Sequence, residues 1–343
     1  MTDFQIEKQL IKSYYAALDE CAVGSIETVL NQFTSSDYLW RGFFPFHEQT
    51  GSLAVSQVFW KPLRKSMSGF QRRMDVFMAG VDSLHEDGAI WVTSMGHLMG
   101  LFDAKWLGIS PNGKIAMLRY AEFHRVENGK IAETAQFCDL IHLMHQAGLQ
   151  PLPPQTGAHL VQPGPRTHDG LLRDKQNPAT GAATLDLINR MIGDIAANSN
   201  GGLGSVPRDA TPQEELQRCW SDQMIWWGPD GIGATYTIDR YVAQHQRPFR
   251  TQLSNRKFHG HIARFAEGNY GGFFGWSNLS VTPEGGYLGL PATGKSAEMR
   301  VVDIYRREGD KLAENWVFID ILFFLKQQGL DVLERMAAMT PKA

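Results

Sequence analysis

The stretch EFHRVENGKIAETAQFCDLIHLMHQAGL, at residues 122–149, decides the fold because it recurs as DIYRREGDKLAENWVFIDILFFLKQQGL at residues 303–330. In the second copy, β-branched and aromatic residues alternate with polar ones on both sides of Glu308-Gly309-Asp310, which predicts two strands joined by a hairpin turn. The second strand ends at Asp320 and leads into an apolar segment that stops at Gly329, a residue type that commonly ends helices. Each copy therefore predicts strand, turn, strand and helix.

The two copies align without a gap at an offset of 181 residues and are identical at ten of 28 positions. Ordinary composition would give roughly two identities. The period is far too long for a solenoid, so we expect two domains. In each half helical patterns precede an antiparallel meander of strands, which predicts an α+β fold. We place the domains at residues 1–150 and 182–343, with a Pro/Gly-rich linker at residues 151–181.

The bulk composition is typical of a soluble globular protein, with 43% hydrophobic residues, 20% charged residues and a formal net charge of −3. This charge gives no electrostatic reason to expect nucleic acid or an anionic membrane as a partner. The N-terminus lacks the pattern of a signal peptide, and no apolar run approaches the length of a membrane span. Cys21, Cys138 and Cys219 show no CxxC spacing, so we expect free thiols and a cytoplasmic location.

Three further motifs lie in the second half, namely WGPDGIG at residues 227–233, HQRPF at residues 245–249 and GDKL at residues 309–312. In these motifs and in the order of its elements, the chain resembles the SnoaL-like polyketide cyclase (ester cyclase) family of the nuclear transport factor 2-like superfamily. The first half matches more weakly, through NGKI at residues 128–131 and through Asp139. The resemblance implies two cone domains, in each of which a curved antiparallel sheet and N-terminal helices enclose a deep apolar pocket.

The resemblance also implies cofactor-free aldol ring closure, in which an aspartate on the last strand transfers the proton. In this sequence Val317 and Gln136 occupy the position of that aspartate, and neither side chain can exchange a proton usefully. Asp320 and Asp139 match a second family aspartate three residues further on. Apolar neighbours raise the pKa of a carboxyl group, so we expect Asp320 to be catalytic; the alternative is a helix cap.

His245 is the second candidate for proton transfer, because an imidazole can take and give a proton near neutral pH. It lies on a helix expected to line the cone, where the first copy has Phe59. Asn315, Tyr236 or Arg247 would stabilise a developing oxyanion. All side chains expected to contact the substrate are polar or aromatic: Trp227, Tyr236, Arg247, Asn315, Trp316, His97 and Asp139. We expect no cofactor and no metal ion.

We therefore predict a cofactor-independent acid/base enzyme that acts on a small, partly apolar carbonyl compound by aldol cyclisation, isomerisation or elimination. Two alternatives stay open. The missing family aspartate favours a non-catalytic binding module, and the several Trp and His residues favour a lyase or dehydratase acting on a sugar-like substrate. We expect the second domain to hold the active site and the first to be mainly structural. Single-domain relatives usually pair as dimers, so the tandem predicts an intrachain pseudo-dimer, with a homo-oligomer also open.

Overall fold

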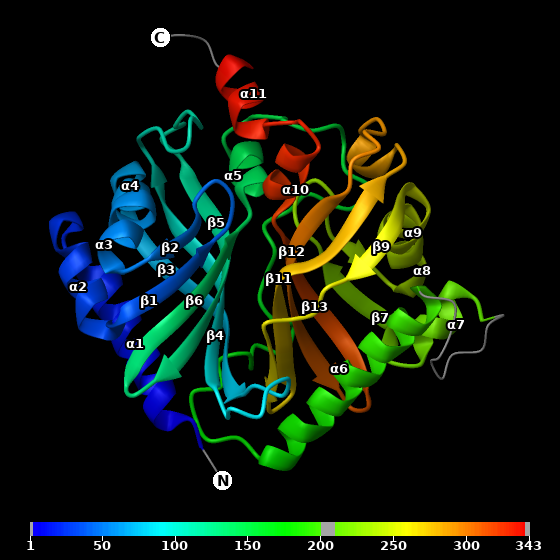
Figure 1. The fold of residues 1–343 in the computed structure, drawn as a ribbon, viewed down its shortest axis with the longest axis horizontal. Helices are drawn as coiled ribbons and strands as arrows, with labels where there is room; N and C mark the ends of the chain where they lie inside the picture. Colours follow the sequence, from blue (N-terminus) through cyan, green and yellow to red (C-terminus); the bar gives the residue numbers. More distant parts are fainter. Residues whose placement is uncertain (1–2, 200–209, 340–343) are drawn as a thin grey trace. The chain divides into compact units, whose positions relative to one another are not determined.

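The computed structural model describes residues 3–199 and 210–339 of the chain. It forms two compact units, drawn in Figure 1. The N-terminal unit consists of Thr2–Pro151, Arg166–Lys175 and Asp320–Ala343, and the C-terminal unit consists of Leu152–Pro165 and Gln176–Ile319. The Pro/Gly-rich linker is thus divided between the units, and the chain after Ile319 belongs to the N-terminal unit. Neither feature was predicted from the sequence.

In the N-terminal unit, helices cover one face of a sheet (Figure 1). These helices are α1 (Gln5–Glu20), η1 (Val23–Ser25), α2 (Ile26–Phe33), α3 (Ser52–Val55), η2 (Ser56–Trp60) and α4 (Lys61–Ser66). The strands are β1 (Thr34–Gly42), β2 (His47–Thr50), β3 (Met67–Val81), β4 (Ile90–Phe102), β5 (Ile115–Glu127) and β6 (Lys130–Cys138). Their order among the described residues is β2-β1-β6-β5-β4-β3, and the β1–β6 pair is parallel while the other neighbours are antiparallel.

The C-terminal unit repeats this topology. Its helices are α6 (Pro178–Ser199), α7 (Pro212–Gln217), α8 (Ile238–Tyr241), η3 (Val242–Gln246), α9 (Arg247–Gln252) and η4 (Tyr287–Gly289). Its strands are β7 (Trp220–Trp227), β8 (Thr235–Tyr236), β9 (Leu253–Phe258), β10 (Ala263–Glu267), β11 (Tyr270–Pro283), β12 (Ala297–Glu308) and β13 (Lys311–Ile319). β13 pairs with β7 in parallel, as β6 does with β1. β9 and β10 both pair with β11, so together they replace the single long strand β3.

Each copy of the repeat ends in a short helix, as predicted. The first is α5 (Leu140–Gln146), the second is α10 (Ile321–Gln327), and the latter is followed by α11 (Val332–Met339). An aspartate stands at the N-cap of both α5 and α10, where its side chain accepts a hydrogen bond from a backbone N–H of the first turn. Gly148 and Gly329 follow these helices with φ values of 85° and 92°, which favour glycine.

The strand pairs of the repeat share an ion-pair arrangement that explains three of the identities between the copies. Arg306 lies 2.8 Å from Glu308 along its own strand and 2.5 Å from Glu314 across the hairpin. Arg125 makes the equivalent contacts in the first copy, at 2.6 Å and 3.6 Å. An arginine can bridge two carboxylates in this way because its planar guanidinium presents several donors.

A tryptophan and the glycine two residues after it occupy the same place in both sheets. The rings of Trp40 and Trp226 lie across Gly42 and Gly228, where an added Cβ atom would meet ring carbons at 2.1 Å and 1.8 Å. A residue with a Cβ atom therefore does not fit after either tryptophan. Both rings are buried, so this pair fixes the ends of β1 and β7 against their cores.

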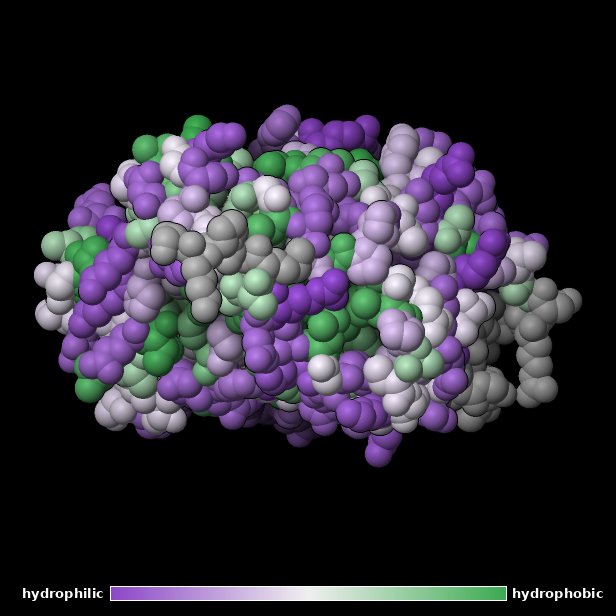
Figure 2. Space-filling model, turned by 90° about the horizontal axis from the view of Figure 1, so that it is seen from above, coloured by the Kyte–Doolittle hydropathy of each residue, from purple (hydrophilic) through white to green (hydrophobic). Residues whose placement is uncertain are grey.

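The surface, the helices and the cysteines agree with what the composition indicates. On the face drawn in Figure 2, hydrophilic residues are interspersed with smaller hydrophobic areas. None of the helices in the described ranges is long and apolar enough to cross a membrane. Cys21, Cys138 and Cys219 are free thiols, as the sequence predicted.

Candidate functional site

The C-terminal unit carries a carboxyl group on the inner face of its sheet, the face against which η3 packs. Asp303 on β12 lies directly opposite Val317 on β13, so the two side chains point to the same side of the sheet. Val317 is the position at which the family resemblance places the catalytic aspartate. The carboxyl group is thus present one strand away from its expected position, at a Cβ–Cβ separation of about 5 Å for such partners.

Asp303 is half-buried and accepts hydrogen bonds from an amide and a phenol. Asn315 donates through Nδ2 to Oδ1 of Asp303 at 3.1 Å, and through the same nitrogen to the carbonyl of Ile304 at 3.1 Å. Burial raises the pKa of Asp303 to about 6, and the hydrogen bonds from Asn315 and Tyr305 limit that rise. A carboxyl group with this pKa is suited to exchanging protons near neutral pH.

The N-terminal unit has a carboxylate at the same place, but there it is part of an ion pair. Glu122 lies opposite Gln136, as Asp303 lies opposite Val317. Arg72 donates through Nη1 to Glu122 at 2.8 Å. Burial acts to raise the pKa of Glu122, but the charge of Arg72 and hydrogen bonds to the carboxylate outweigh it and hold the pKa below its ordinary value. Glu122 is therefore a poor proton acceptor.

The strand registers show what separates these two carboxyl groups. Arg72 on β3 lies opposite Leu98 of β4. At the corresponding place in the C-terminal unit, opposite Leu279 of β11, β9 carries Phe258. Phe258 has no charge and is 55% exposed, so it does not supply the cation that Arg72 provides. The presence of Arg72 in one unit, together with the hydrogen bonds that His124 and Tyr15 make to Glu122, thus separates a carboxylate of lowered pKa from the carboxyl group of raised pKa in the other unit.

His245 lies in the π-helical turn η3, at the place that Phe59 occupies in η2. Its ring stacks on Trp226 with centroids 4.0 Å apart. Burial lowers the pKa of His245 to about 3, so the imidazole is neutral near pH 7. Its Nδ1 atom is buried without a hydrogen-bond partner among the described residues. These surroundings favour a neutral hydrogen-bonding role over the proton transfer that the sequence suggested.

Both π-helical turns precede a proline, Pro62 in η2–α4 and Pro248 in η3–α9. Proline has no N–H group to donate to the carbonyl four residues earlier, which disturbs the regular helix locally. In the C-terminal unit this carbonyl belongs to Gln244 and accepts a hydrogen bond from the hydroxyl of Thr156 at 2.6 Å. The proline thus leaves a helix carbonyl available to the linker.

A small, partly open pocket of about 60 Å³ lies beside His245. Its walls come from four parts of the C-terminal unit, one of which is the helical segment η3–α9 with Gln244, His245, Pro248 and Gln252. The linker contributes Gln155 and Thr156, the β7–β8 loop contributes Ile232, and η4 contributes Tyr287. The Pro/Gly-rich linker is therefore part of the pocket.

Tyr241 connects this pocket with Asp303. Its ring centroid lies 5.3 Å from that of His245. Burial raises the pKa of Tyr241, and the nearby charge of Asp303 raises it further. His245 and Asp303 therefore belong to one interior region of the C-terminal unit.

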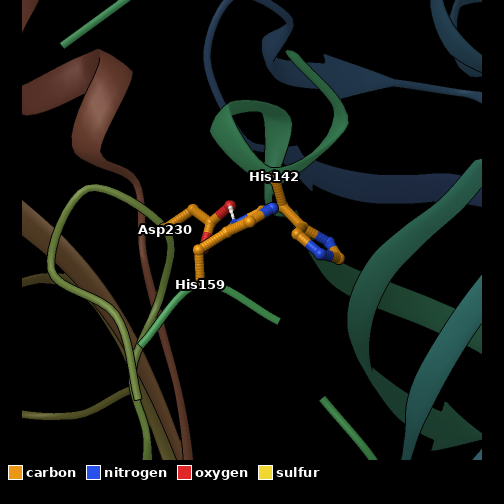
Figure 3. Close-up of side chains that lie close together, drawn as sticks. All are labelled: His142, His159 and Asp230. Atoms are coloured by element: carbon orange, nitrogen blue, oxygen red, sulfur yellow. Dashed lines mark hydrogen bonds and ion pairs between the residues drawn. The ribbon is translucent and has the colours of Figure 1, made fainter. Parts of the chain in front are cut away.

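The WGPDGIG motif, singled out in the sequence, binds the linker. The backbone N–H of Gly231 donates to Oε1 of Gln155 at 2.9 Å. Nδ1 of His159 lies 2.8 Å from Oδ2 of the buried Asp230, the contact marked in Figure 3. The third side chain labelled there, His142, belongs to the N-terminal unit. The motif thus shapes one wall of the pocket by holding the linker.

Both aspartates that the sequence singled out are helix caps. Oδ1 of Asp320 accepts from the N–H of Phe323 at 3.3 Å, and Oδ2 accepts from the N–H of Phe44 at 2.8 Å. Asp139 caps α5 in the same way. Asp320 belongs to the N-terminal unit and His245 to the C-terminal unit. The structure therefore does not place these two candidates in the site of one unit, and it supports the capping alternative.

Two of the expected binding residues, Tyr236 and Arg247, are exposed. Tyr236 on the edge strand β8 is 54% exposed, and its hydroxyl donates to Gln223 at 2.6 Å. It alternates with the buried Thr235, so it faces away from the core. Arg247 follows His245 by two residues, which places it on a different side of the helix. The expectation that they contact the substrate is not supported.

Three other expected binding residues lie on the outer faces of the sheets because side chains alternate along a strand. Trp316 adjoins the inner-facing Asn315, and its Nε1 donates to the carbonyl of Pro163 at 3.1 Å. Trp227 is the register partner of Trp316 on β7. His97 faces away from the inner side of the N-terminal sheet, where Glu122 lies. Asn315 is the expected binding residue that the structure places beside a carboxyl group.

Sequence reasoning missed Asp303. In the sequence it is one charged residue in an alternating strand, and the first copy has Glu122 at the same place. The hairpin turn at Gly309 could have revealed Asp303, because the position of this turn sets residue 303 opposite residue 317.

The fold is a tandem of two domains of one α+β class, each with helices over the inner face of a curved sheet. Within this class, the family model described as SnoaL-like polyketide cyclase matches residues 61–147 and 277–328, one segment in each half of the chain. The resemblance predicted from the sequence is thereby confirmed. The family suggests a cyclase or isomerase type of function.

Several solved structures are similar over about one domain. An NTF2-like protein of Burkholderia thailandensis is 21% identical, with 42% of this chain and 97% of that chain covered and a TM-score of 0.31. A candidate polyketide cyclase of Xanthomonas campestris pv. campestris is 17% identical, with 43% and 99% covered and a TM-score of 0.33. IdmH, a candidate polyketide cyclase of Streptomyces antibioticus, is 16% identical, with 42% and 99% covered and a TM-score of 0.33. No curated protein matches the chain.

Proposed function

We propose that the C-terminal unit is a cofactor-independent acid/base catalyst that moves a proton beside the carbonyl group of a small, partly apolar substrate. The reaction is an aldol cyclisation, an isomerisation or an elimination. The observation that carries this proposal is Asp303, a half-buried carboxyl group with a pKa of about 6 opposite the expected catalytic position. The match to a family of polyketide cyclases supports the reaction class.

In this mechanism ionised Asp303 accepts a proton from the carbon next to the substrate carbonyl. The C–H bond breaks, and its electron pair passes into an enolate. In an aldol closure the enolate carbon then bonds to a second carbonyl carbon, and the resulting alkoxide takes the proton back from Asp303. Asn315 and Tyr305 orient the carboxylate through their hydrogen bonds. Neutral His245 offers a ring N–H to the developing oxyanion.

The N-terminal unit has a structural role in this proposal. Its equivalent carboxylate, Glu122, is paired with Arg72, which itself lies over the rings of Tyr15 and Tyr120. The guanidinium thus occupies the space beside the carboxylate, and its charge keeps the pKa of Glu122 low. Both effects disfavour proton abstraction from a carbon acid.

Deuterium incorporation tests the proposal without knowledge of the natural substrate. A panel of neutral ketones and 1,3-dicarbonyl compounds is incubated with the protein in D₂O, and NMR follows exchange next to the carbonyl. The wild-type protein is expected to accelerate exchange, with a rate that rises with pH around pH 6, where Asp303 ionises. Asp303→Asn should slow the accelerated exchange by about 10²–10⁴-fold, the usual contribution of a general base.

Two matched variants sharpen this test. Glu122→Gln changes the equivalent carboxylate of the N-terminal unit, and Asp320→Asn changes the helix cap that the sequence favoured as catalytic. Both should keep the exchange rate. Exchange in Asp303→Asn that equals the wild-type rate would refute the role of Asp303. A wild-type protein that accelerates no exchange would refute the enzyme and favour the binding module.

A further inference from the structure

We infer that the linker segment Leu152–Pro165 forms one wall of the binding site in the C-terminal unit. Together with His245, this wall forms a pocket that is selective for uncharged ligands. The ligand class is a ketone, ester or phenol, bound in preference to a carboxylate or phosphate of the same shape. This inference extends the proposed function. The ligand is identified as the substrate only on the basis of that proposed function.

The linker joins the C-terminal unit through backbone hydrogen bonds. Gly157 donates to the carbonyl of Ile232 at 2.7 Å, and Ala158 and Ala234 exchange two hydrogen bonds at 2.8 Å and 3.0 Å. The backbones approach so closely that a Cβ atom on Gly157 would lie 2.6 Å from the carbonyl carbon of Gly233. The linker wall is therefore specified by this sequence and is not a loose covering.

Side chains anchor the linker on the far side of this backbone contact. Nε2 of the buried Gln162 donates to the carbonyl of Gly228 at 2.5 Å. Trp316 donates through Nε1 to the carbonyl of Pro163 at 3.1 Å. The first bond is to Gly228, two residues after Trp226 and just beyond the end of β7, and the second is from the tryptophan that the sequence analysis expected to contact the substrate. Together with the Thr156–Gln244 bond, they hold the linker wall against η3 and β7.

The described residues that line the pocket include no Asp, Glu, Lys or Arg. The two ionisable ones, His245 and Tyr287, are held neutral, because burial lowers the pKa of His245 to about 3 and raises that of Tyr287. The polar groups of the lining are amides and hydroxyls, including Gln155, Thr156 and Gln252. An anionic ligand would lose hydration here without gaining a counter-charge, whereas a neutral one would keep its hydrogen bonds.

His245 supplies a directional contact in this neutral lining. Its Nδ1 atom is buried, and its ring is stacked on Trp226, so Nε2 is the ring nitrogen that a ligand in the pocket can reach. A neutral imidazole nitrogen can bond to a carbonyl or hydroxyl oxygen. The stacked rings also favour a flat ligand. Phe59 shows that the same turn of the other unit accommodates a ring without these nitrogens.

The test compares methyl 2-naphthoate with 2-naphthoate, which differ in charge at pH 7.5 and share a ring system. Calorimetry with the full-length protein gives both affinities. The ester should bind at least tenfold more tightly than the acid. Gln252→Lys adds a cation to the lining and should reduce this preference at least tenfold, while Gln217→Lys, on the exposed end of α7, should leave it unchanged.

Two further variants test the named parts of the pocket. His245→Phe, which introduces the residue that the other unit has at position 59, should weaken ester binding at least fivefold. Thr156→Val should do the same by freeing the linker wall. Circular dichroism verifies that each variant is folded. Equal affinities for ester and acid in the wild-type protein, or a preference that Gln252→Lys does not alter, would overturn the inference.

The result is separable from that of the proposed function. Asp303→Asn should slow deuterium exchange by the factor given above and retain the preference for the ester. Selectivity without exchange in the wild-type protein would refute the catalyst and uphold the neutral pocket. Exchange without selectivity would uphold the catalyst and refute the pocket.

Discussion

Asp303 and Glu122 occupy the same position in the two copies, and their pKa values are shifted in opposite directions. Both are removed from bulk water, which disfavours the charged form. A main difference is Arg72, which pairs with Glu122, whereas β9 has the uncharged and exposed Phe258 at the corresponding register position. At the residue scale, the direction of each pKa shift is therefore set by the groups around the carboxyl group and not by the carboxyl group itself.

The raised pKa of Asp303 predicts a pH-dependent cost to stability. The folded-state value of about 6 exceeds the ordinary 3.8, so the folded protein binds this proton more tightly than the unfolded chain. The free energy of unfolding should therefore fall by up to about 3 kcal/mol as pH rises from about 4 through about 6. Asp303→Asn lacks this group, so its stability relative to wild type should increase over the same range. Urea denaturation between pH 4 and pH 8 measures the difference.

Glu122→Gln provides the opposite control. The lowered pKa of Glu122 contributes stability that is present at neutral pH and is lost as pH falls through the folded-state pKa. This variant should therefore be less stable than wild type at pH 7, with a smaller difference in acid. If the difference in the free energy of unfolding between Asp303→Asn and wild type is the same at every pH, this result would contradict the environment described for Asp303.

At the element scale, the linker consists of two consecutive segments, each of which packs against a different unit. Residues 152–165 bind the C-terminal unit, whereas Arg166–Lys175 binds the N-terminal unit. In the second part, Phe77 of β3 donates to the carbonyl of Gly170 at 2.8 Å. The buried Lys8 of α1 also donates through Nζ to the carbonyl of Leu172 at 2.6 Å. A lysine so deeply buried is unusual, and this bond gives it a structural role.

Lys8→Met should release the second segment of the linker. The substitution keeps the apolar stem but removes the donor to the Leu172 carbonyl, at a cost of about 1–3 kcal/mol. Trypsin cleavage at Arg166, Arg173 or Lys175 should accelerate by about tenfold, since cleavage follows the population of the opened segment. Lys12→Met, at an exposed position of the same helix, should cleave at the wild-type rate. Equal rates for both variants would argue against the anchoring role of Lys8.

The elements themselves were largely predictable from the sequence, because their periodicity and turn residues are local signals. The repeat was detectable since scaffold contacts recur. For example, Lys130 and Lys311 donate to carbonyls near the ends of α2 and α7, at Gln32 and Gln217. The attachment of the linker was not predictable, because Gly157 makes it through its backbone. Asp303 was missed because its proposed role depends on pairing across strands, and because Phe258 rather than an arginine occupies the position that corresponds to Arg72.

At the scale of the whole molecule, the division into units does not follow the order of the chain. The segment Asp320–Ala343 succeeds the last strand of the C-terminal unit but belongs to the N-terminal unit. Asp320 accepts from the N–H of Phe44 at 2.8 Å, and the ring of Phe323 lies 6.2 Å from that of His47. A sequence repeat marks where a motif recurs and contains no information about which unit its final helix packs against.

Removal of residues 320–343 should therefore destabilise the N-terminal unit more than the unit that precedes it in sequence. The truncation leaves the buried N–H of Phe44 without its acceptor and exposes the surface covered by α10. Hydrogen exchange followed by mass spectrometry should show faster exchange in peptides from β1 and β2, with β12 and β13 less affected. The reverse pattern would show that the tail stabilises the C-terminal unit.

The position of Asp320 in the chain has a consequence for biosynthesis. The ribosome delivers the first 151 residues early, yet the carboxylate that binds the Phe44 amide emerges only after the entire C-terminal unit. At about 5–20 residues per second, this delay is roughly 10–30 s. During that interval the nascent N-terminal unit lacks α10 and the contacts that Asp320 and Phe323 make with Phe44 and His47. The half of the protein that is translated first is thus the half that is completed last.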